Sequence, residues 1–358
     1  MTFVRGFVSG AVASVTCYAV YTFVFISKDE DIPDYSRIRM KESVPYLEDV
    51  RLLEKPRGIL KYGIPEYGPR LIYYNDHVLA YDRLKKTPVW VAEHITPRNL
   101  NGDANRKKSK FKPDPDIPAQ FSARNEDYFK SGWSRGHMAP AGNYKNDQKS
   151  MDETFFLTNI VPQDYKNNAG FWNRFEIYCR DLAKIFNDVR VFTGPLVLPD
   201  FKEDGRLYVT YPVIGQSQVS VPTHLYKVIV AETSNTNQTL IGAFVVPNKP
   251  IGYDYDLKDF QVKLEDLEIK SGITFLPKLD QTAKRADLCK IEKCQLMTAK
   301  QFELYVFGRR LQGVKNINQL HKIWKELEEK NLKPDEFLVK LYKRKRTELE
   351  KKNKKNEL

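Results

Sequence analysis

The sequence predicts an α+β protein with a mixed, mainly antiparallel central sheet and a helical C-terminal part. Short runs of β-branched and aromatic residues, separated by Gly, Pro or Asn, occupy residues 71–95 and 189–248, and such runs are typical of strands. From about Lys284 the apolar residues recur instead at helical spacing, as Leu320, Ile323 and Leu327 do. A chain of 358 residues is long enough for one large domain or two modest ones.

Local signals place several of these elements. Residues 71–83 form two apolar runs around the polar pair 75–76, which predicts a hairpin. A helix is expected to end just before Gly272, because glycine is the commonest residue beyond a helix C-terminus. Thr298 and Gln301 match a capping box, which predicts that a helix begins there.

The net charge favours an anionic partner. The chain carries a formal charge of +12 and has a pI near 9.2, which indicates nucleic acid, a membrane surface or both. From Gln281 onward, 21 Lys and Arg residues stand against 11 Asp and Glu residues, a surplus of ten. Most of the net charge therefore belongs to the C-terminal part.

The four cysteines form neither a disulfide framework nor a zinc motif. Cys289 and Cys294 are close enough in the chain to pair, but two half-buried thiols are the expected state. The histidines His77, His94 and His224 lie in or beside predicted strands, and we interpret them as structural.

The amino-terminal segment predicts a transmembrane anchor. Residues 6–27 include no charged residue, and roughly 20 apolar residues suffice for a helix to span a bilayer. A cleaved signal peptide is the alternative, but the run is long and lacks a small-x-small cleavage site before a polar break. Because Arg5 precedes the run, the amino terminus is expected on the cytoplasm- or matrix-like side. We assign residues 1–35 to the anchor and its flank, and residues 36–60 to a linker.

Residues 131–180 carry the chemistry. His137 is a candidate general base, because imidazole titrates near neutral pH. Arg135 lies two residues earlier, which places both side chains on one face of an extended segment. There its guanidinium can clamp a phosphate. The basic cluster 106–110 upstream is either a solvated loop or a grip on a nucleic-acid backbone, with Arg106 the best candidate and Lys145 a second.

A helix-like segment follows and supplies oxygen ligands. Asn168 offers an amide oxygen of the hard type that Mg²⁺ prefers. Glu176 and Arg180 are i,i+4 neighbours on a helix, with Asn168 on roughly the same side. One helix can thus present a metal ligand, an acid to order the metal's water molecules and a second phosphate-binding arginine.

The ordered motifs SRGHMAP, TNIVPQ and Asn168-x3-Trp172-x3-Glu176-x3-Arg180 resemble the DNA/RNA non-specific endonuclease family. This family has a ββα-metal nuclease core, and the similarity runs from about Tyr62 to Pro277. The resemblance implies that His137 is the general base and that Asn168 is the direct protein ligand of a single Mg²⁺ or Mn²⁺. Glu176 would organise the metal-bound water molecules. Products would carry 5′-phosphate and 3′-hydroxyl ends.

The resemblance also assigns the remaining site residues. Arg135 and Arg180 would bind the phosphate and the transition state, and Asn159 in TNIVPQ matches a further site asparagine. The family signature is Asp-Arg-Gly-His, so Ser134 replaces an aspartate. An uncharged hydroxyl cannot give the same electrostatic support.

Ser134, the N-terminal anchor and the basic C-terminal extension together resemble the mitochondrial exo/endonuclease G branch of the family. That resemblance implies a homodimeric 5′–3′ exonuclease on the mitochondrial inner membrane, facing the intermembrane space. Its substrate would be single- or double-stranded DNA, with RNA as a further candidate. Residues 61–280 would form the nuclease domain, residues 281–345 a helical wing that limits how substrate threads, and residues 346–358 a basic tail.

Two alternatives remain open from the sequence. One is an endonuclease G-like enzyme that cuts internal sites. The other is a catalytically weak, membrane-tethered nucleic-acid-binding protein in which Ser134 marks a decayed site. The presence of His137, Asn168 and Glu176 together favours an active nuclease.

Overall fold

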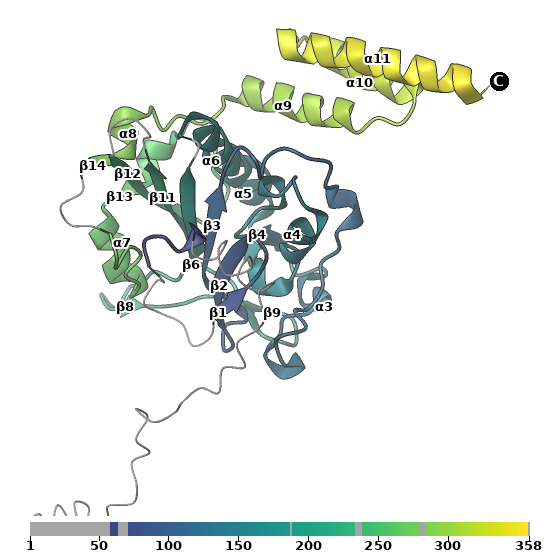
Figure 1. Ribbon diagram of the computed structural model, residues 1–358. Helices are drawn as coiled ribbons and strands as arrows, with labels where there is room; N and C mark the ends of the chain where they lie inside the picture. Colours follow the sequence, from purple (N-terminus) through teal and green to yellow (C-terminus); the bar gives the residue numbers. More distant parts are fainter. Residues whose placement is uncertain (1–57, 64–70, 187, 233–237, 280–283, 357–358) are drawn as a thin grey trace, which may run out of the picture. The chain divides into compact units, whose positions relative to one another are not determined.

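The computed structural model describes residues 58–63, 71–186, 188–232, 238–279 and 284–356. A central sheet lies among helices, and three further helices end the chain (Figure 1). The anchor predicted for residues 6–27 lies outside the described ranges. Within those ranges, no helix is both long and apolar enough to cross a membrane.

The central sheet is antiparallel apart from one pairing. Its eight strands run in the order β1, β2, β3, β6, β11, β12 and β13, with β14 also beside β12. Only β12 and β14 pair in parallel among the described strands of this sheet. The predicted mixed, mainly antiparallel sheet is therefore confirmed. The strands are β1 Leu71–Tyr73, β2 His77–Asp82, β3 Thr87–Ile95, β6 Val189–Leu196, β11 His224–Glu232, β12 Thr239–Pro247, β13 Gln261–Val262 and β14 Arg285–Asp287.

Side chains alternate between the two faces of the sheet, and each face buries a separate core. On β11, Leu225 and Ile229 belong to the core covered by helix α6 (Asn173–Phe186). Tyr226 and Val228 belong to the opposite core, which includes Leu267 of helix α7 (Leu264–Ser271). Gly272 ends α7 in the left-handed conformation with a φ of 68°, as predicted.

The site-bearing segment lies beside the main sheet. A two-stranded antiparallel sheet, β4 (Ser134–His137) with β5 (Ile160–Gln163), leads into α5 (Tyr165–Asn167) and a π-helical turn (Asn168–Trp172). The remaining short elements are α3 Asn125–Tyr128, α4 Gln148–Glu153, β7 Asp200–Phe201, β8 Leu207–Tyr208, β9 Val213–Ile214, β10 Val219–Ser220 and α8 Leu288–Ile291.

The C-terminal part forms three helices: α9 (Ala299–Gln312), α10 (Ile317–Glu329) and α11 (Glu336–Asn356). Because α11 runs from the expected wing into the expected basic tail, the wing denotes these three helices from here on. The wing has its own hydrophobic core, which is separate from the two sheet cores and includes Phe307 and Leu320. The predicted capping box at its start is confirmed, because Thr298 Oγ1 accepts from Gln301 N at 3.3 Å while Gln301 Oε1 accepts from Thr298 N at 2.9 Å. Residues 285–291 precede the wing and join the sheet through β14.

The expectation of two free thiols at Cys289 and Cys294 was wrong, because the two residues form a disulfide. The intervening loop turns back through Cys294, which has a left-handed φ of 46° and is fully buried. Spacing in the sequence does not reveal this turn. Cys179 is the free cysteine of the described ranges and is buried.

His77 is completely buried on β2, and its ring stacks on Tyr74 with 4.4 Å between the ring centroids. Within the described part of the chain, neither of its ring nitrogens has a hydrogen-bond partner. Burial lowers the pKa of His77 to about 3. The folded protein therefore holds this imidazole neutral, whereas the unfolded chain binds a proton below about pH 6.5.

We expect the free energy of unfolding to fall as the pH drops below about 6.5, because the unfolded state then takes up a proton that folded His77 refuses. At pH 5 this proton uptake lowers the free energy of unfolding by about 2 kcal/mol relative to its value at pH 7.5. In His77→Phe that share of the loss should vanish, and urea unfolding of both proteins at the two pH values measures it. An equal acid loss in wild type and variant would contradict the assignment.

Candidate active site

The antiparallel pairing of β4 with β5 fixes the SRGH segment against the PQ motif. Ser134 pairs with Gln163 and His137 with Ile160. A Cβ atom on Gly136 would lie 2.1 Å from Gln163 Oε1, so a side chain at this position would collide with the buried glutamine. The glycine between Arg135 and His137 is therefore required by packing.

His137 sits in an aromatic cage. Its ring centroid lies 5.2 Å from that of Phe111 and 4.9 Å from that of Phe155, and the residue is 6% exposed. Burial, followed by the nearby charges of Arg106 and His77, lowers the pKa of His137 to about 3. Its Nε2 is buried without a hydrogen-bond partner within the described residues. The imidazole is thus neutral at physiological pH, which is the state that can accept a proton.

Asn159 lies behind the site and does not line the cavity that the other residues share. Its Oδ1 accepts from Ala139 N at 2.9 Å, and its Nδ2 donates to the carbonyl oxygens of Ala139 and Thr154 at 2.9 and 2.8 Å. Every polar group of the side chain is therefore used to hold the loop that follows His137. The structure places Asn159 as a brace of this loop.

Ser134 orients Asn168. The Ser134 hydroxyl donates to Gln163 O at 2.8 Å and accepts from Asn168 Nδ2 at 3.0 Å. Because the amide nitrogen of Asn168 is tied to serine, its Oδ1 is the atom left free to ligate a cation. The serine that departs from the family signature thus still contacts the candidate metal ligand.

The helix that carries the acid and the second arginine does not start as a regular α-helix. Residues 168–172 form a π-helical turn before α6 begins at Asn173. In a regular α-helix, Asn168 would lie about 80° away from Glu176 around the axis. A π turn advances less per residue, so it moves Asn168 towards the face of Glu176. The sequence pattern did not predict this turn.

Glu176 and Arg180 project from α6 into the same cavity. Burial raises the pKa of the half-buried Glu176, although the charges of Arg180, Lys227, Arg106 and Arg309 oppose this effect. Arg180 Nη1 donates to Asn143 Oδ1 at 3.1 Å.

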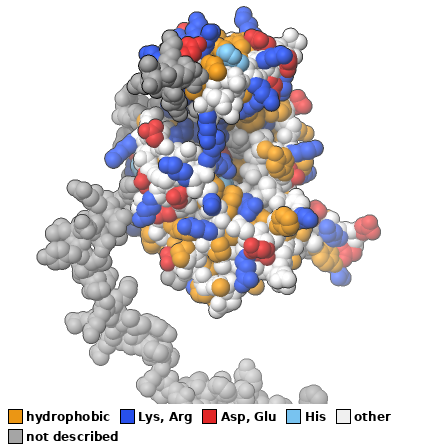
Figure 2. Space-filling view, turned by 90° about the vertical axis from the view of Figure 1, so that its right-hand side faces the viewer, with side chains coloured by type: hydrophobic (Ala, Val, Ile, Leu, Met, Phe, Trp, Pro, Cys, Tyr) orange, Lys and Arg blue, Asp and Glu red, His pale blue; other side chains and the backbone are white. Residues whose placement is uncertain are grey.

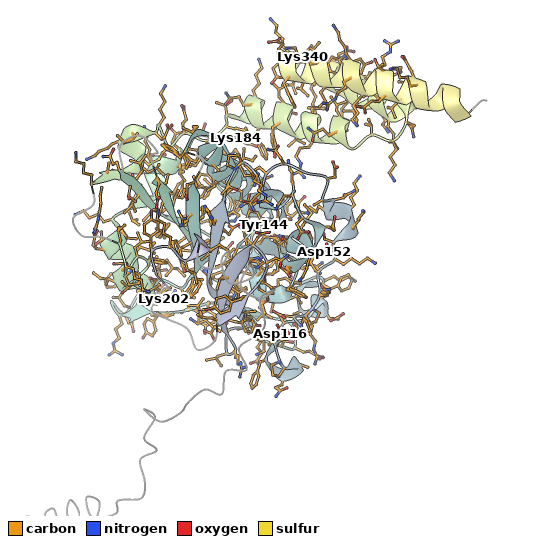
Figure 3. All side chains as sticks on the ribbon, viewed as in Figure 1. Asp116, Tyr144, Asp152, Lys184, Lys202 and Lys340 are labelled. Atoms are coloured by element: carbon orange, nitrogen blue, oxygen red, sulfur yellow. A yellow bond between two sulfur atoms is a disulfide. The ribbon has the colours of Figure 1, made fainter. Side chains whose placement is uncertain are left out.

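A buried carboxylate beneath the site fixes this asparagine. Asn143 Nδ2 donates to Glu93 Oε1 at 2.9 Å, and Tyr144 Oη donates to the same oxygen at 2.6 Å. In Figure 3, Tyr144 lies in the interior of the sheet domain. Because Glu93 holds the side-chain nitrogen of Asn143, the side-chain oxygen of Asn143 faces Arg180. Burial raises the pKa of Glu93 to about 7.

Arg135 lies beside two aromatic rings, with its guanidinium carbon 4.8 Å from the centroid of Phe111 and 5.9 Å from that of Tyr128. It also donates to Asn125 Oδ1. The aromatic rings and Asn125 therefore hold the guanidinium of Arg135 in place. Its remaining N–H donors are available to a phosphate in the cavity.

One cavity of about 1560 Å³ joins these side chains. Of the predicted site residues, eight line it: Arg106, Ser134, Arg135, His137, Lys145, Asn168, Glu176 and Arg180. Residues of the wing, including Tyr305 and Arg309, form part of its wall. No local motif marked them, because they meet the site only through the fold.

The cavity is positively charged. Seven Lys or Arg residues and three Asp or Glu residues line it. The pKa of Lys145 is lowered by burial and then by Arg180, Arg309 and Lys184. Figure 2 shows Lys and Arg side chains gathered around a hollow in the upper half of the face. Such crowding of cations favours a polyanionic ligand.

A buried neutral histidine, an available amide oxygen and clustered arginines in a basic cavity are the groups that phosphodiester cleavage requires, and here they lie on an α+β scaffold. The chain belongs to the DNA/RNA non-specific endonuclease family, whose model matches residues 55–282. A second model, described as the endo/exonuclease (EXOG) C-terminal domain, matches residues 297–345, which include α9 and α10.

Two curated relatives are similar over most of the chain. The chain is 52% identical over 295 residues to "Nuclease EXOG, mitochondrial" of Danio rerio, covering 82% of this chain and 86% of the relative. It is 48% identical to the protein of the same name from Xenopus laevis, covering 97% and 92%.

Among solved structures, a chain from the crystal structure of the EndoG/EndoGI complex is similar with a TM-score of 0.63 and 39% identity. The match covers 65% of this chain and 98% of that chain.

Proposed function

We propose that this chain is a metal-dependent, sugar-non-specific nuclease that hydrolyses phosphodiester bonds of DNA, works mainly from 5′ ends and acts in mitochondria. The main support is that neutral His137 and Asn168, whose Oδ1 is available to a cation, line the same basic cavity. The similarity to mitochondrial EXOG nucleases, including the wing segment, supports the exonuclease mode and the compartment.

In the proposed reaction His137 takes a proton from a water molecule. The water oxygen forms a bond to phosphorus as the bond to the 3′ oxygen breaks. The 3′ oxygen leaves with the electron pair of that bond and takes a proton from a second water molecule, which gives a 5′-phosphate and a 3′-hydroxyl. Arg135 and Arg180 neutralise the charge that develops on the phosphate oxygens. Asn168 would hold Mg²⁺ or Mn²⁺, with Glu176 ordering the surrounding water molecules. A bound metal supplies Lewis-acid stabilisation and charge for the leaving oxygen.

We also propose how the chain is anchored in the membrane, how it assembles and which residues contact nucleic acid. The charge-free run at residues 6–27 would anchor the chain in the inner membrane with its nuclease domain in the intermembrane space. Two copies would form a homodimer, as the family resemblance implies. Arg106 and Lys145 would contact the nucleic-acid backbone.

The test uses the full chain purified in mild detergent. We expect 5′-labelled linear duplex DNA to be degraded with Mg²⁺ or Mn²⁺ and to stay intact with EDTA. Equal degradation of a covalently closed circle would favour the endonuclease G-like alternative. Tight, salt-sensitive binding without any product would favour the catalytically weak nucleic-acid-binding alternative.

Ser134→Ala should weaken Mg²⁺ binding, because it removes the group that orients Asn168 and leaves Asn168 itself in place. Losing the acceptor for Asn168 Nδ2 frees the amide to rotate, so we expect about 10–100-fold weaker apparent Mg²⁺ affinity, the usual cost of losing a partner that orients a ligand. Initial rates over a Mg²⁺ titration measure it. Ser131→Ala is the matched control, because the Ser131 hydroxyl donates to Tyr128 O at the end of α3 and contacts no predicted metal ligand. An unchanged titration midpoint for Ser134→Ala would refute the orienting role.

A further inference from the structure

Arg174 is a buried arginine on the catalytic helix that the reaction does not use. It is 2% exposed, although arginine is rarely buried without paired charge. Its guanidinium donates to Met297 O at 2.9 Å through Nη1 and to Gly252 O at 3.2 Å through Nη2. Both acceptors are backbone carbonyls, so the side chain acts as a clamp between chain segments.

The clamped segment is the linker that leads into the wing. Met297 immediately precedes Thr298, the N-cap residue of α9. Next to it, Leu296 is buried in the sheet core and Cys294 is tied to Cys289 by the disulfide. Tyr178 Oη contacts Cys294 Sγ at 3.4 Å. Arg174 and Tyr178 are i,i+4 neighbours, so one face of α6 holds the linker at two points.

A series of ring contacts continues from Arg174 into the wing. Its guanidinium lies 4.3 Å from the ring centroid of Tyr253, and the ring of Tyr253 lies 6.4 Å from that of Phe302 on α9. The wing has a hydrophobic core of its own. The position of α9 relative to the sheet therefore depends on the linker and on these contacts.

The opposite side of α6 carries the chemistry. Glu176 follows Arg174 by two residues, which separates them by about 200° around the helix axis. Glu176 lines the cavity, and α9 lines the same cavity through Leu304, Tyr305 and Gly308. One helix therefore positions both the reacting groups and the wall that restricts access to them.

We propose that Arg174 is a positioning residue that determines substrate selectivity: by clamping the linker at Met297 O, it holds α9 over the cavity and so restricts cleavage to DNA ends. This inference rests on the proposed nuclease function. Releasing the clamp lets α9 move away from the cavity and admits an internal stretch of duplex, while His137, Asn168 and Glu176 stay in place.

The test compares full-length Arg174→Leu and Arg174→Lys with wild type. Leucine removes both donors but keeps an apolar contact with Tyr253, whereas lysine keeps a charged donor. Hydrogen exchange of the α9 amides should be fastest in Arg174→Leu and intermediate in Arg174→Lys. The rate on a closed circle relative to 5′-labelled linear duplex should rise about tenfold or more in Arg174→Leu, since a hydrogen bond from a charged donor shifts an equilibrium by roughly that factor.

Two further measurements separate selectivity from general damage. The rate on a short single-stranded oligonucleotide should stay within about threefold of wild type, because the groups that react are untouched. Arg346→Leu removes an exposed arginine that pairs with Glu350 inside α11, so it should change neither the exchange of α9 nor the substrate ratio.

Faster α9 exchange with an unchanged circle-to-linear ratio would overturn the inference, and so would unchanged exchange. If Arg174→Leu does not purify as a folded protein, the same two readouts on Arg174→Lys decide. A wild-type chain that cleaves no DNA would instead overturn the proposed function, and the exchange data would still show whether Arg174 holds α9.

Discussion

Replacing His137 with alanine is expected to lower kcat on duplex DNA by about 10²–10⁴-fold, the usual contribution of a general base. The imidazole is neutral because burial between Phe111 and Phe155 lowers its pKa to about 3. Alanine leaves no group in this cage that can take the proton of the attacking water. DNA binding should change little, because Arg106, Lys145 and Arg180 remain in the cavity.

Initial rates under saturating DNA and Mg²⁺ measure this loss, and fluorescence anisotropy with labelled DNA measures binding. His321→Ala is the matched control, since His321 is exposed on α10 and does not line the cavity. A His137→Ala enzyme with wild-type kcat would show that another group takes the proton. Loss of binding in step with loss of rate would mean that the cage, rather than the base, had failed.

The parts of the fold that the sequence could predict are those set by local chemistry. The hairpin at residues 71–82, the Thr298 capping box and the Gly272 helix end each depend on a few neighbouring residues. The catalytic candidates behave in the same way, because Arg135 and His137 share one strand while Glu176 and Arg180 share one helix. Short-range periodicity is sufficient to put such pairs on one face.

The features that escaped prediction depend on groups distant in the chain. The disulfide requires a left-handed turn at Cys294 that spacing does not encode. Asn159 matched a family position, but its bonds to Ala139 and Thr154 come from how the loop folds over it. Arg309 lines the cavity although it lies on α9, far from residues 131–180 in the chain. Tertiary contacts of this kind have no periodic signature in a single sequence.

Removing the amide oxygen of Asn168 should be about as damaging as removing the base. If this oxygen is the direct protein ligand of the metal, Asn168→Ala deprives the leaving oxygen of several kcal/mol of charge stabilisation, which corresponds to about a 10³-fold lower kcat/KM. The Ser134 hydroxyl holds the amide nitrogen of Asn168, which leaves the oxygen as the atom that could bind a metal.

The size of the loss and its dependence on metal distinguish a ligand from a structural residue. Raising Mg²⁺ should recover part of the activity of Asn168→Ala if affinity is the main defect, and thermal unfolding without metal should stay close to wild type. Asn168→Asp keeps an oxygen at the same place and should retain more activity than alanine, because carboxylate oxygens are good ligands for Mg²⁺. Asn101→Ala, a change at an exposed asparagine outside the cavity, is the control. Asn168 is not the ligand if Asn168→Ala needs no more Mg²⁺ than wild type and loses less than about tenfold in rate. In that case Glu176 would have to hold a metal in this cavity.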